Sequence, residues 1–321
     1  MNVLLLGSGN REHIIGYKLI KSNCILYTNS NNSDLNKIAK KITNVTVSNN
    51  ELVKISIEIG INMVVVDSEK YLDNGIVDLF ENVGIPCIGP NKMCSLIETS
   101  KLFTRRFLND NELSKYNPKY KIFYLGDKGY TEFISELNYE YVIKPDKLHD
   151  DKVFKLSKEY TRDFFEISKY CESIYKNYES FVIEEKLKGD KFSLMSFTDG
   201  KTIKHMIPIK KNKRFITEDT SIDTNTMKND LWFLNNDNIN TCQHINETVI
   251  RVLSERYGKY KGIINCNFIL TPNSNIKIIG FNTRFGDNES INILYLLKND
   301  LLEVFNSITG GYLDNINLEF K

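Results

Sequence analysis

The sequence lacks several features that would place it quickly in a class of protein. No apolar run approaches the length of a transmembrane span, and the short run at residues 1–7 has no basic segment before it, so no signal peptide is expected. The net charge is only +1, which gives no global field to attract nucleic acid or an anionic membrane. The six cysteines are scattered without the spacing of a metal site. We therefore expect a cytoplasmic protein with reduced thiols and with neither a nucleic-acid nor a membrane partner.

The first hundred residues also lack the polar alternation of a half-exposed sheet. Short runs rich in β-branched residues alternate there with amphipathic helical patterns, which predicts an α/β domain with a parallel sheet covered on both faces. The predicted strands are residues 2–6, 24–27, 62–66 and 84–90, and the predicted helices are 12–20, 51–59 and 74–83.

The rest of the chain mixes strands with helices in a different order, and an Asp199-Gly200 turn signal separates two of the strands. This pattern predicts an α+β region with antiparallel pairing. The predicted strands are 120–124, 139–143, 181–185, 191–197, 202–209, 261–270 and 276–281. The predicted helices are 95–108, 131–137, 160–177 and 241–257, and a polar loop covers 210–227.

A glycine turn, Gly7-Ser8-Gly9, lies between the first strand and the first helix. Glycine lets a backbone approach a phosphate, and the helix N-terminus adds N–H donors, so the turn with Asn10, Arg11 and Glu12 is a candidate phosphate site. Such a turn also serves many proteins only as a tight bend, and Arg11 could be a solvated charge. The third glycine of a dinucleotide fingerprint and its distant acid are missing, which argues against a nicotinamide dehydrogenase.

A series of motifs in one order resembles the phosphoribosylamine–glycine ligase family, also called glycinamide ribonucleotide synthetase. The stretch at 3–13 is similar to the family's GSGGREH signature, and the other matches resemble VVGPE…GxxD, GIPxFGP, EGSKAF, VIKADG, VIEEFLDG and KSDLVEL. They are found at residues 65–78, 84–90, 98–103, 141–146, 182–189 and 298–303. The run 278–287 further resembles the last strand of the ATP-grasp core, which carries ligands of Mg²⁺–ATP.

The resemblance implies an ATP-grasp fold after the N-terminal domain, with ATP and Mg²⁺ as cofactors. It implies a phosphate-binding domain at 1–100, an ATP-grasp subdomain with a linker helix at 101–187 and a second subdomain at 188–321. The end of the chain resembles the join to a C-terminal domain of the family, so that domain is expected to be absent. In the family, ATP phosphorylates the glycine carboxylate, and the amine of phosphoribosylamine then attacks the acyl phosphate in purine synthesis.

The resemblance also assigns roles to residues. It places Lys101, Lys144 and the flap residue Lys152 on the ATP phosphates, and it places Glu184 and Glu185 where the backbone reads adenine and a carboxylate takes ribose hydroxyls. The remaining roles are a metal ligand, a phosphate-proximal arginine and a substrate-loop acid, and they fall on Asn282, Arg284 and Asp219.

Three positions depart from the family pattern. The strand that normally ends in Glu-x-Asn has Gly280 in place of the glutamate, which leaves Asn282 as the metal ligand unless Asp287 or Glu289 compensates. The glycine-rich flap corresponds to residues 147–154 and the substrate loop to 219–227, and both have lost their glycines. Two hypotheses follow. The protein is a carbon–nitrogen ligase of this family, or it is a relative that binds a nucleotide, a sugar phosphate or a partner protein without ligation.

Overall fold

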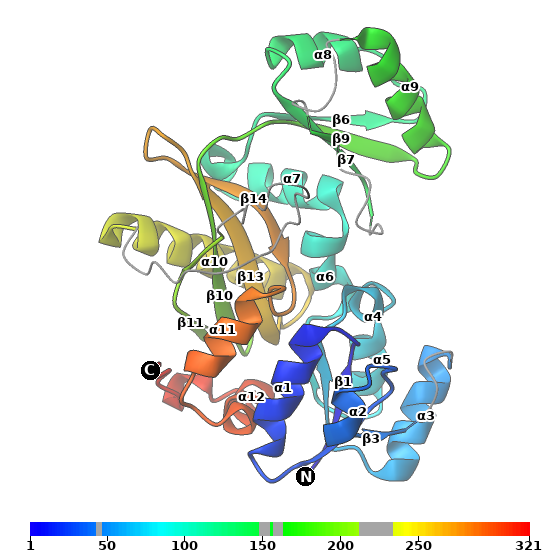
Figure 1. The fold of residues 1–321 in the computed structure, drawn as a ribbon, viewed down its shortest axis with the longest axis vertical. Helices are drawn as coiled ribbons and strands as arrows, with labels where there is room; N and C mark the ends of the chain where they lie inside the picture. The colour runs from blue at the N-terminus through cyan, green and yellow to red at the C-terminus, as the bar shows by residue number, and fades with distance from the viewer. Residues whose placement is uncertain (43–46, 148–154, 157–162, 212–233) are drawn as a thin grey trace, which may run out of the picture. The chain divides into compact units, whose positions relative to one another are not determined.

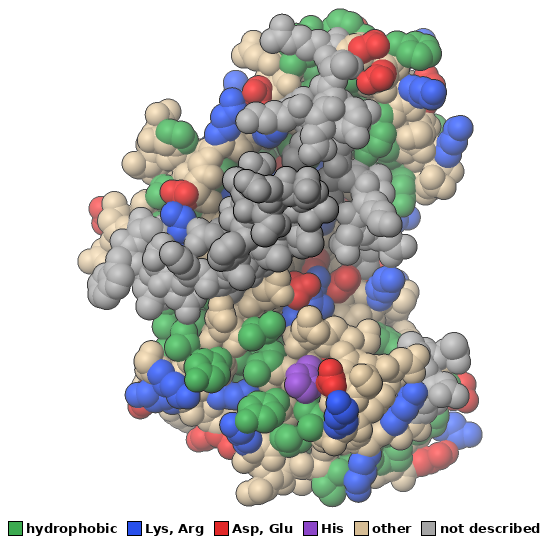
Figure 2. All heavy atoms as spheres, in the orientation of Figure 1, with side chains coloured by type: hydrophobic (Ala, Val, Ile, Leu, Met, Phe, Trp, Pro, Cys, Tyr) green, Lys and Arg blue, Asp and Glu red, His purple; other side chains and the backbone are tan. Residues whose placement is uncertain are grey.

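The protein is represented by a computed structural model, and its chain forms two compact units (Figure 1). The structure describes residues 1–42, 47–147, 155–156, 163–211 and 234–321. The first unit consists of residues 1–95, 191–267 and 281–321, and the second consists of 96–190 and 268–280. In the described ranges, no helix is both long and apolar enough to cross a membrane. Acidic and basic side chains are intermixed on the face in Figure 2, as a net charge of +1 suggests.

A five-stranded parallel sheet lies at the start of the first unit, which confirms the predicted α/β domain. Its strand order is β3-β2-β1-β4-β5. Because side chains alternate along β1, Val3 and Leu5 pack on one face with α1, while Leu4 and Leu6 pack on the other with α3 and α5. The elements are β1 (Asn2–Leu6), α1 (Asn10–Ile20), β2 (Ile25–Thr28), α2 (Leu35–Ile38), β3 (Lys40–Lys41), α3 (Asn49–Ile59), β4 (Met63–Val66), α4 (Glu69–Asp73), α5 (Ile76–Asn82) and β5 (Cys87–Ile88).

A second sheet has the order β11-β10-β13-β14, with β12 also paired to β10. Its strands are β10 (Asp190–Thr198), β11 (Ile203–His205), β12 (Ile209–Lys210), β13 (Gly262–Leu270) and β14 (Ile276–Asn282). The long helix α10 (Asn236–Tyr257) begins five residues before its predicted start. On α10, Asn246 donates from Nδ2 to the Leu194 carbonyl at 3.2 Å and to the Ser196 Oγ at 3.0 Å, which ties the helix to β10.

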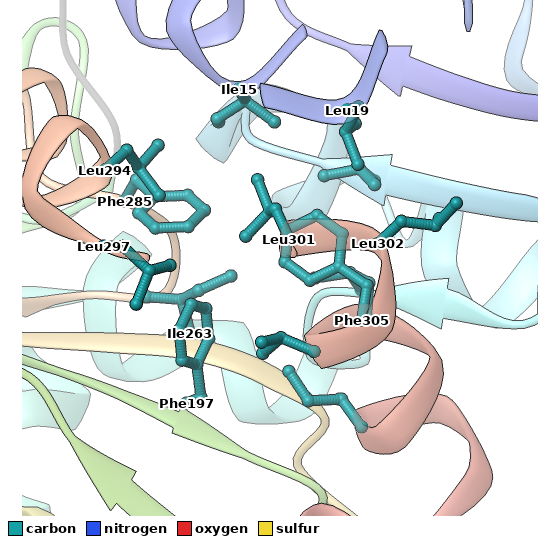
Figure 3. Close-up of a cluster of buried hydrophobic side chains, with 14 of the residues drawn as sticks. Ile15, Leu19, Phe197, Ile263, Phe285, Leu294, Leu297, Leu301, Leu302 and Phe305 are labelled. Atoms are coloured by element: carbon teal, nitrogen blue, oxygen red, sulfur yellow. The ribbon is translucent and has the colours of Figure 1, made fainter. Parts of the chain in front are cut away.

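The largest core of the first unit gathers residues that are far apart in the sequence. Figure 3 shows Ile15 and Leu19 of α1 pointing into one cluster with Leu301 and Phe305, and Phe285 lies in the same cluster. The later elements are α11 (Glu289–Leu296), α12 (Leu301–Gly310) and η2 (Leu313–Asn315). Neither α11 nor α12 is among the helices predicted from the sequence.

The second unit contains a four-stranded sheet of order β6-β9-β7-β8, antiparallel as predicted. Phe123, Ile143 and Phe181 of this sheet pack in one buried cluster with α8 and α9. Its elements are α7 (Lys101–Asp110), η1 (Ser114–Tyr116), β6 (Tyr120–Tyr124), α8 (Tyr130–Glu136), β7 (Tyr141–Pro145), β8 (Lys155–Leu156), α9 (Phe164–Tyr175) and β9 (Ser180–Glu185), and α6 (Lys92–Thr99) leads into them.

Candidate active site

Two residues predicted for the nucleotide site, Lys144 and Glu184, lie side by side in the second unit. The register pairs Val142 of β7 with Glu184 of β9, so Lys144, two residues along β7, is on the same face and diagonal to the carboxylate. The Lys144 Nζ donates to the Glu184 Oε2 at 2.7 Å. Only 12 % of the lysine side chain and 4 % of the glutamate side chain are exposed. The structure therefore brings this predicted pair together in a nearly buried position.

The third member of this group, Arg105 of α7, is not among the residues predicted from the sequence. Its Nε and Nη2 donate to the two carboxylate oxygens of Glu184 at 2.7 and 2.8 Å. Its Nη1 donates to the Asn117 Oδ1 and the Ile278 carbonyl, and its Nη2 also reaches the Ile279 carbonyl at 2.7 Å. A planar guanidinium suits such a fork, which a lysine could not reproduce. The one available signal is that Arg105 lies four residues after Lys101 on the same helix.

The Glu184 carboxylate is thus held between two cations. Burial alone would raise its pKa, but the Arg105 guanidinium and the Lys144 ammonium outweigh burial and hold the pKa at about 2. Burial lowers the pKa of Lys144 to about 8, since the attraction of Glu184 only partly offsets burial and Arg105 repels the ammonium. One carboxylate cannot neutralise two cations, so the trio keeps one positive charge in excess. Such a site favours an anion, and phosphate oxygens suit both side chains.

The neighbouring predicted residues, Lys101 and Glu185, have different surroundings. The Lys101 Nζ donates to the Glu98 carbonyl at 2.9 Å, and burial lowers the pKa of the lysine. Its helix begins at Ser100, whose Oγ accepts from the Phe103 N–H at 3.1 Å. The Glu185 carboxylate accepts from the Lys119 N–H at 2.8 Å and lies on the opposite side of β9 from Glu184. Lys101 thus belongs to the buried basic region, and Glu185 does not.

In the first unit, the predicted phosphate turn is occupied by the carboxylate of Glu12. The Gly9 N–H donates to the Glu12 Oε2 at 2.7 Å, and the glutamate is 1 % exposed. A Cβ placed on Gly7 would lie 2.0 Å from the Glu12 Oε1, and Gly7 has a φ of +135°. Gly7 is therefore required both for its backbone conformation and for the close approach of the carboxylate. The turn binds its own side chain, so the Gly9 N–H is not free for a phosphate.

Two predicted arginines, Arg11 and Arg284, both lie beside Glu69, which follows β4, and Arg11 also contacts Asp67. The Arg11 Nε donates to the Asp67 Oδ2 at 3.1 Å, and its Nη2 lies 3.9 Å from the Glu69 Oε2. The Arg284 Nε is 2.8 Å from the same Glu69 oxygen. The Phe285 N–H donates to the Asp67 Oδ1 at 3.0 Å, which fixes the turn that carries Arg284. The structure therefore joins the glycine turn to the turn after β14 through two acids to which the sequence analysis gives no role.

Asp67 has the most perturbed carboxyl group of this cluster. Burial raises its pKa to about 7; Arg11 opposes this shift and Glu12 adds to it. Burial also raises the pKa of Glu12. A carboxyl group with a pKa near 7 can hold or release a proton at neutral pH, which is the property required of a general acid or base.

The candidate metal position at the end of β14 has few side chains that could act as metal ligands. Asn282 ends the strand, and Gly280 has no side chain to offer, although a Cβ added there would meet no atom within 4 Å. The described part of the chain contains no group of three or more His, Cys, Asp or Glu residues that could hold a metal. Because Mg²⁺ prefers carboxylate oxygens, this strand alone does not fit the ion. Lys152 and Asp219 lie outside the described residues, as do most of the flap and all of the substrate loop.

The sequence matches two parts of one family along most of its length. Residues 1–98 match the phosphoribosylglycinamide synthetase N domain, and residues 99–290 match its ATP-grasp (A) domain. The chain is 34% identical over 341 residues to a phosphoribosylamine–glycine ligase of Methanocaldococcus jannaschii, and 33% identical over 334 residues to one of Methanosphaera stadtmanae. These alignments cover 100% and 99% of this chain, and 76% and 74% of the relatives.

Solved structures with the same fold include a ligase and a carboxylase. The phosphoribosylamine–glycine ligase of Thermotoga maritima has a TM-score of 0.71 at 19% identity and covers 97% of this chain and 76% of its own. The biotin carboxylase domain of Hydrogenobacter thermophilus 2-oxoglutarate carboxylase, in complex with MgADP, has a TM-score of 0.76 at 14% identity and covers 100% and 72%. These likenesses confirm the fold alone. The two family matches and the relatives above 30% identity show that this chain belongs to the phosphoribosylglycinamide synthetase family.

Proposed function

We propose that this protein is an ATP-dependent ligase that joins glycine to phosphoribosylamine, the activity named for its relatives. The observation that carries the proposal is the buried trio of Arg105, Glu184 and Lys144, which keeps one positive charge in excess. Lys101, which is half-buried, adds a second ammonium in the same unit. This arrangement of cations suits the phosphates of a nucleotide.

The proposed reaction has two steps. A glycine carboxylate oxygen attacks the γ-phosphorus of ATP, and ADP leaves to give an acyl phosphate. The amine of phosphoribosylamine then attacks the acyl carbon, the new C–N bond forms, and inorganic phosphate leaves with the carbon–oxygen electron pair. The attacking amine loses a proton in the process. Mg²⁺, when bound with ATP, would neutralise charge on the phosphates.

The described residues have separate parts in this scheme. Lys144 and Lys101 would orient the nucleotide phosphates, and Arg105 holds Glu184 so that the Lys144 ammonium keeps its position. In the first unit, Arg11 and Arg284 present guanidinium groups suited to a phosphate or carboxylate of the other substrates. Three acids surround these two arginines, so the cluster has no excess of positive charge, and we expect weaker anion binding there than at the trio.

The direct test is ADP release in the presence of ATP, Mg²⁺, glycine and phosphoribosylamine. We expect release that stops when either glycine or phosphoribosylamine is omitted. The Lys144→Met variant, purified in the same way, controls for contaminating ligases and should be almost inactive. ATP binding by calorimetry without any substrate-dependent ADP release would contradict the proposal and would identify a relative that binds without ligation.

Restoring a carboxylate on β14 gives a further prediction. Because a side chain at Gly280 has open space, Gly280→Glu should fold normally and should strengthen Mg²⁺-dependent ATP binding. A carboxylate ligand should improve the affinity about tenfold, equivalent to about 1.4 kcal/mol. The measurement is calorimetric titration with ATP in the presence and absence of Mg²⁺. Gly280→Gln is the control of equal size, and an equal gain in both variants would show that charge on the metal ligand is not the cause.

A further inference from the structure

A group of buried polar atoms without hydrogen-bond partners lies in the first unit. Both polar atoms of the Asn265 amide are unpartnered, although the residue is fully buried. The Oε2 of Glu289 is also unpartnered, and this residue is 1 % exposed. A buried polar group without a hydrogen-bond partner destabilises the folded state. Three such atoms in one place indicate a site that is completed by something else.

Along one face of the second sheet, the side chains change from apolar to polar, and the unpartnered atoms lie where this change occurs. On β13, Asn265 shares a face with Ile263, and on β10, Ser193 shares a face with Phe197. Ile263 and Phe197 are part of the apolar cluster in Figure 3, together with Phe285. Asn265, two residues from Ile263, and Ser193, four residues from Phe197, replace apolar side chains with polar ones on this face. The Ser193 Oγ donates to the Glu289 Oε1 at 3.4 Å.

Gly286 allows the unpartnered atoms to approach one another. A Cβ on this residue would lie 2.4 Å from the Asn265 Nδ2 and 3.0 Å from the Glu289 Oε2. Both atoms therefore pack directly against the Gly286 backbone, and any other residue at 286 would collide with them. The Lys211 Nζ contacts the Glu289 Oε1 and lies 2.7 Å from the Asn267 Oδ1. The Lys211 side chain is 32% exposed, so the group reaches solvent through this flexible residue.

The hydrogen-bonding needs of these three atoms restrict the chemical groups that a ligand could present to them. The Asn265 Nδ2 needs an acceptor, whereas the Asn265 Oδ1 and the Glu289 Oε2 need donors. An ammonium only donates, so it would leave the amide N–H unmet. A phosphate or carboxylate mainly accepts, and the Glu289 charge repels it. A hydroxyl both donates and accepts, and two adjacent hydroxyls would satisfy all three atoms.

We propose that Asn265 and Glu289 bind the vicinal hydroxyls of a pentose phosphate, with Lys211 moving aside as the sugar enters. This inference rests on the proposed function, in which the second substrate is a ribosyl compound. One hydroxyl accepts from the Asn265 Nδ2 and donates to the Glu289 Oε2, and the other donates to the Asn265 Oδ1. Glu289 thereby acts as a sugar-binding residue, rather than as a substitute metal ligand for Gly280.

The test is a thermodynamic cycle in which one hydroxyl is removed from the sugar and one polar side chain is changed in the protein. Ribose 5-phosphate and 2-deoxyribose 5-phosphate are titrated by calorimetry into the 321-residue chain, its Asn265→Leu variant and its Glu289→Gln variant. The wild-type protein should prefer ribose 5-phosphate about tenfold, because the deoxy sugar leaves a buried polar group unmet. The preference should fall to nearly one in Asn265→Leu and should be reduced in Glu289→Gln, which keeps the shape but loses the charge.

Asn246→Leu is the matched control, because Asn246 is a buried asparagine of the same unit whose amide bonds to β10. It should lower the melting temperature without changing the preference between the sugars. If both sugars bind and the preference is unaltered in Asn265→Leu, the inference is wrong and buried water completes the three atoms. If neither sugar binds the wild-type protein, the ribosyl substrate of the proposed function fails as well.

Discussion

Replacing Arg105 with methionine is expected to destabilise the protein by about 3–5 kcal/mol, the loss typical of breaking a buried ion pair. The guanidinium contacts both oxygens of Glu184, so its removal leaves a buried carboxylate with Lys144 as its remaining cation. It also leaves the Ile278 and Ile279 carbonyls without this donor. Urea unfolding monitored by circular dichroism measures the change, and we expect a lower midpoint with an unchanged slope.

The next residue provides a matched control, because Arg106 is exposed and bonds to the Tyr124 hydroxyl. Arg106→Met should change the stability by no more than about 0.5 kcal/mol. Adding Glu184→Gln to Arg105→Met should recover part of the loss, since it removes the uncompensated charge. Equal unfolding midpoints for Arg105→Met and Arg106→Met would show that the fork on Glu184 contributes nothing to stability.

Lys144 and Glu184 illustrate what a sequence can predict about such a site. Both lie near the ends of apolar strands, where a charge is conspicuous, and a family motif surrounds each of them. Arg105 has neither advantage, because a charged residue in an amphipathic helix is usually solvent-exposed. Its burial depends on the carbonyls of β14, which lie more than 170 residues later in the chain. A local sequence pattern cannot indicate contacts between residues that lie so far apart in the chain.

The glycine turn shows a second limit of sequence reasoning. The pattern at residues 7–12 places a tight turn before a helix, and the structure has both. The same pattern predicts an open phosphate cradle, whereas the Glu12 carboxylate takes up the Gly9 N–H. A short acidic side chain three residues after a turn can cap the backbone or point to solvent, and only its surroundings decide which. The role of the turn in phosphate binding stays a prediction.

The second large effect is expected for Lys144→Met, which should weaken ATP binding about 10- to 100-fold. A hydrogen bond between an ammonium and a phosphate contributes about 1.5–3 kcal/mol, and methionine keeps the length of the side chain without its charge. Glu184 keeps its fork with Arg105 in this variant, so the fold should survive. Calorimetric titration with ATP at pH 7.5 measures the loss, and Lys54→Met on the exposed side of α3 is the control.

The same residue gives ATP binding a distinctive pH dependence. Burial lowers the pKa of Lys144 to about 8, so its ammonium is charged below pH 8 and loses its proton as the pH rises further. Binding of phosphate favours the ammonium, hence the dissociation constant should rise by up to about tenfold per pH unit above pH 8. The rise should end at the higher pKa of the complex. Lys144→Met should show a shallower rise between pH 7.5 and 10, because Lys101, whose pKa burial also lowers, still titrates beside the nucleotide. An equally steep rise in that variant would show that Lys144 does not contact the phosphates.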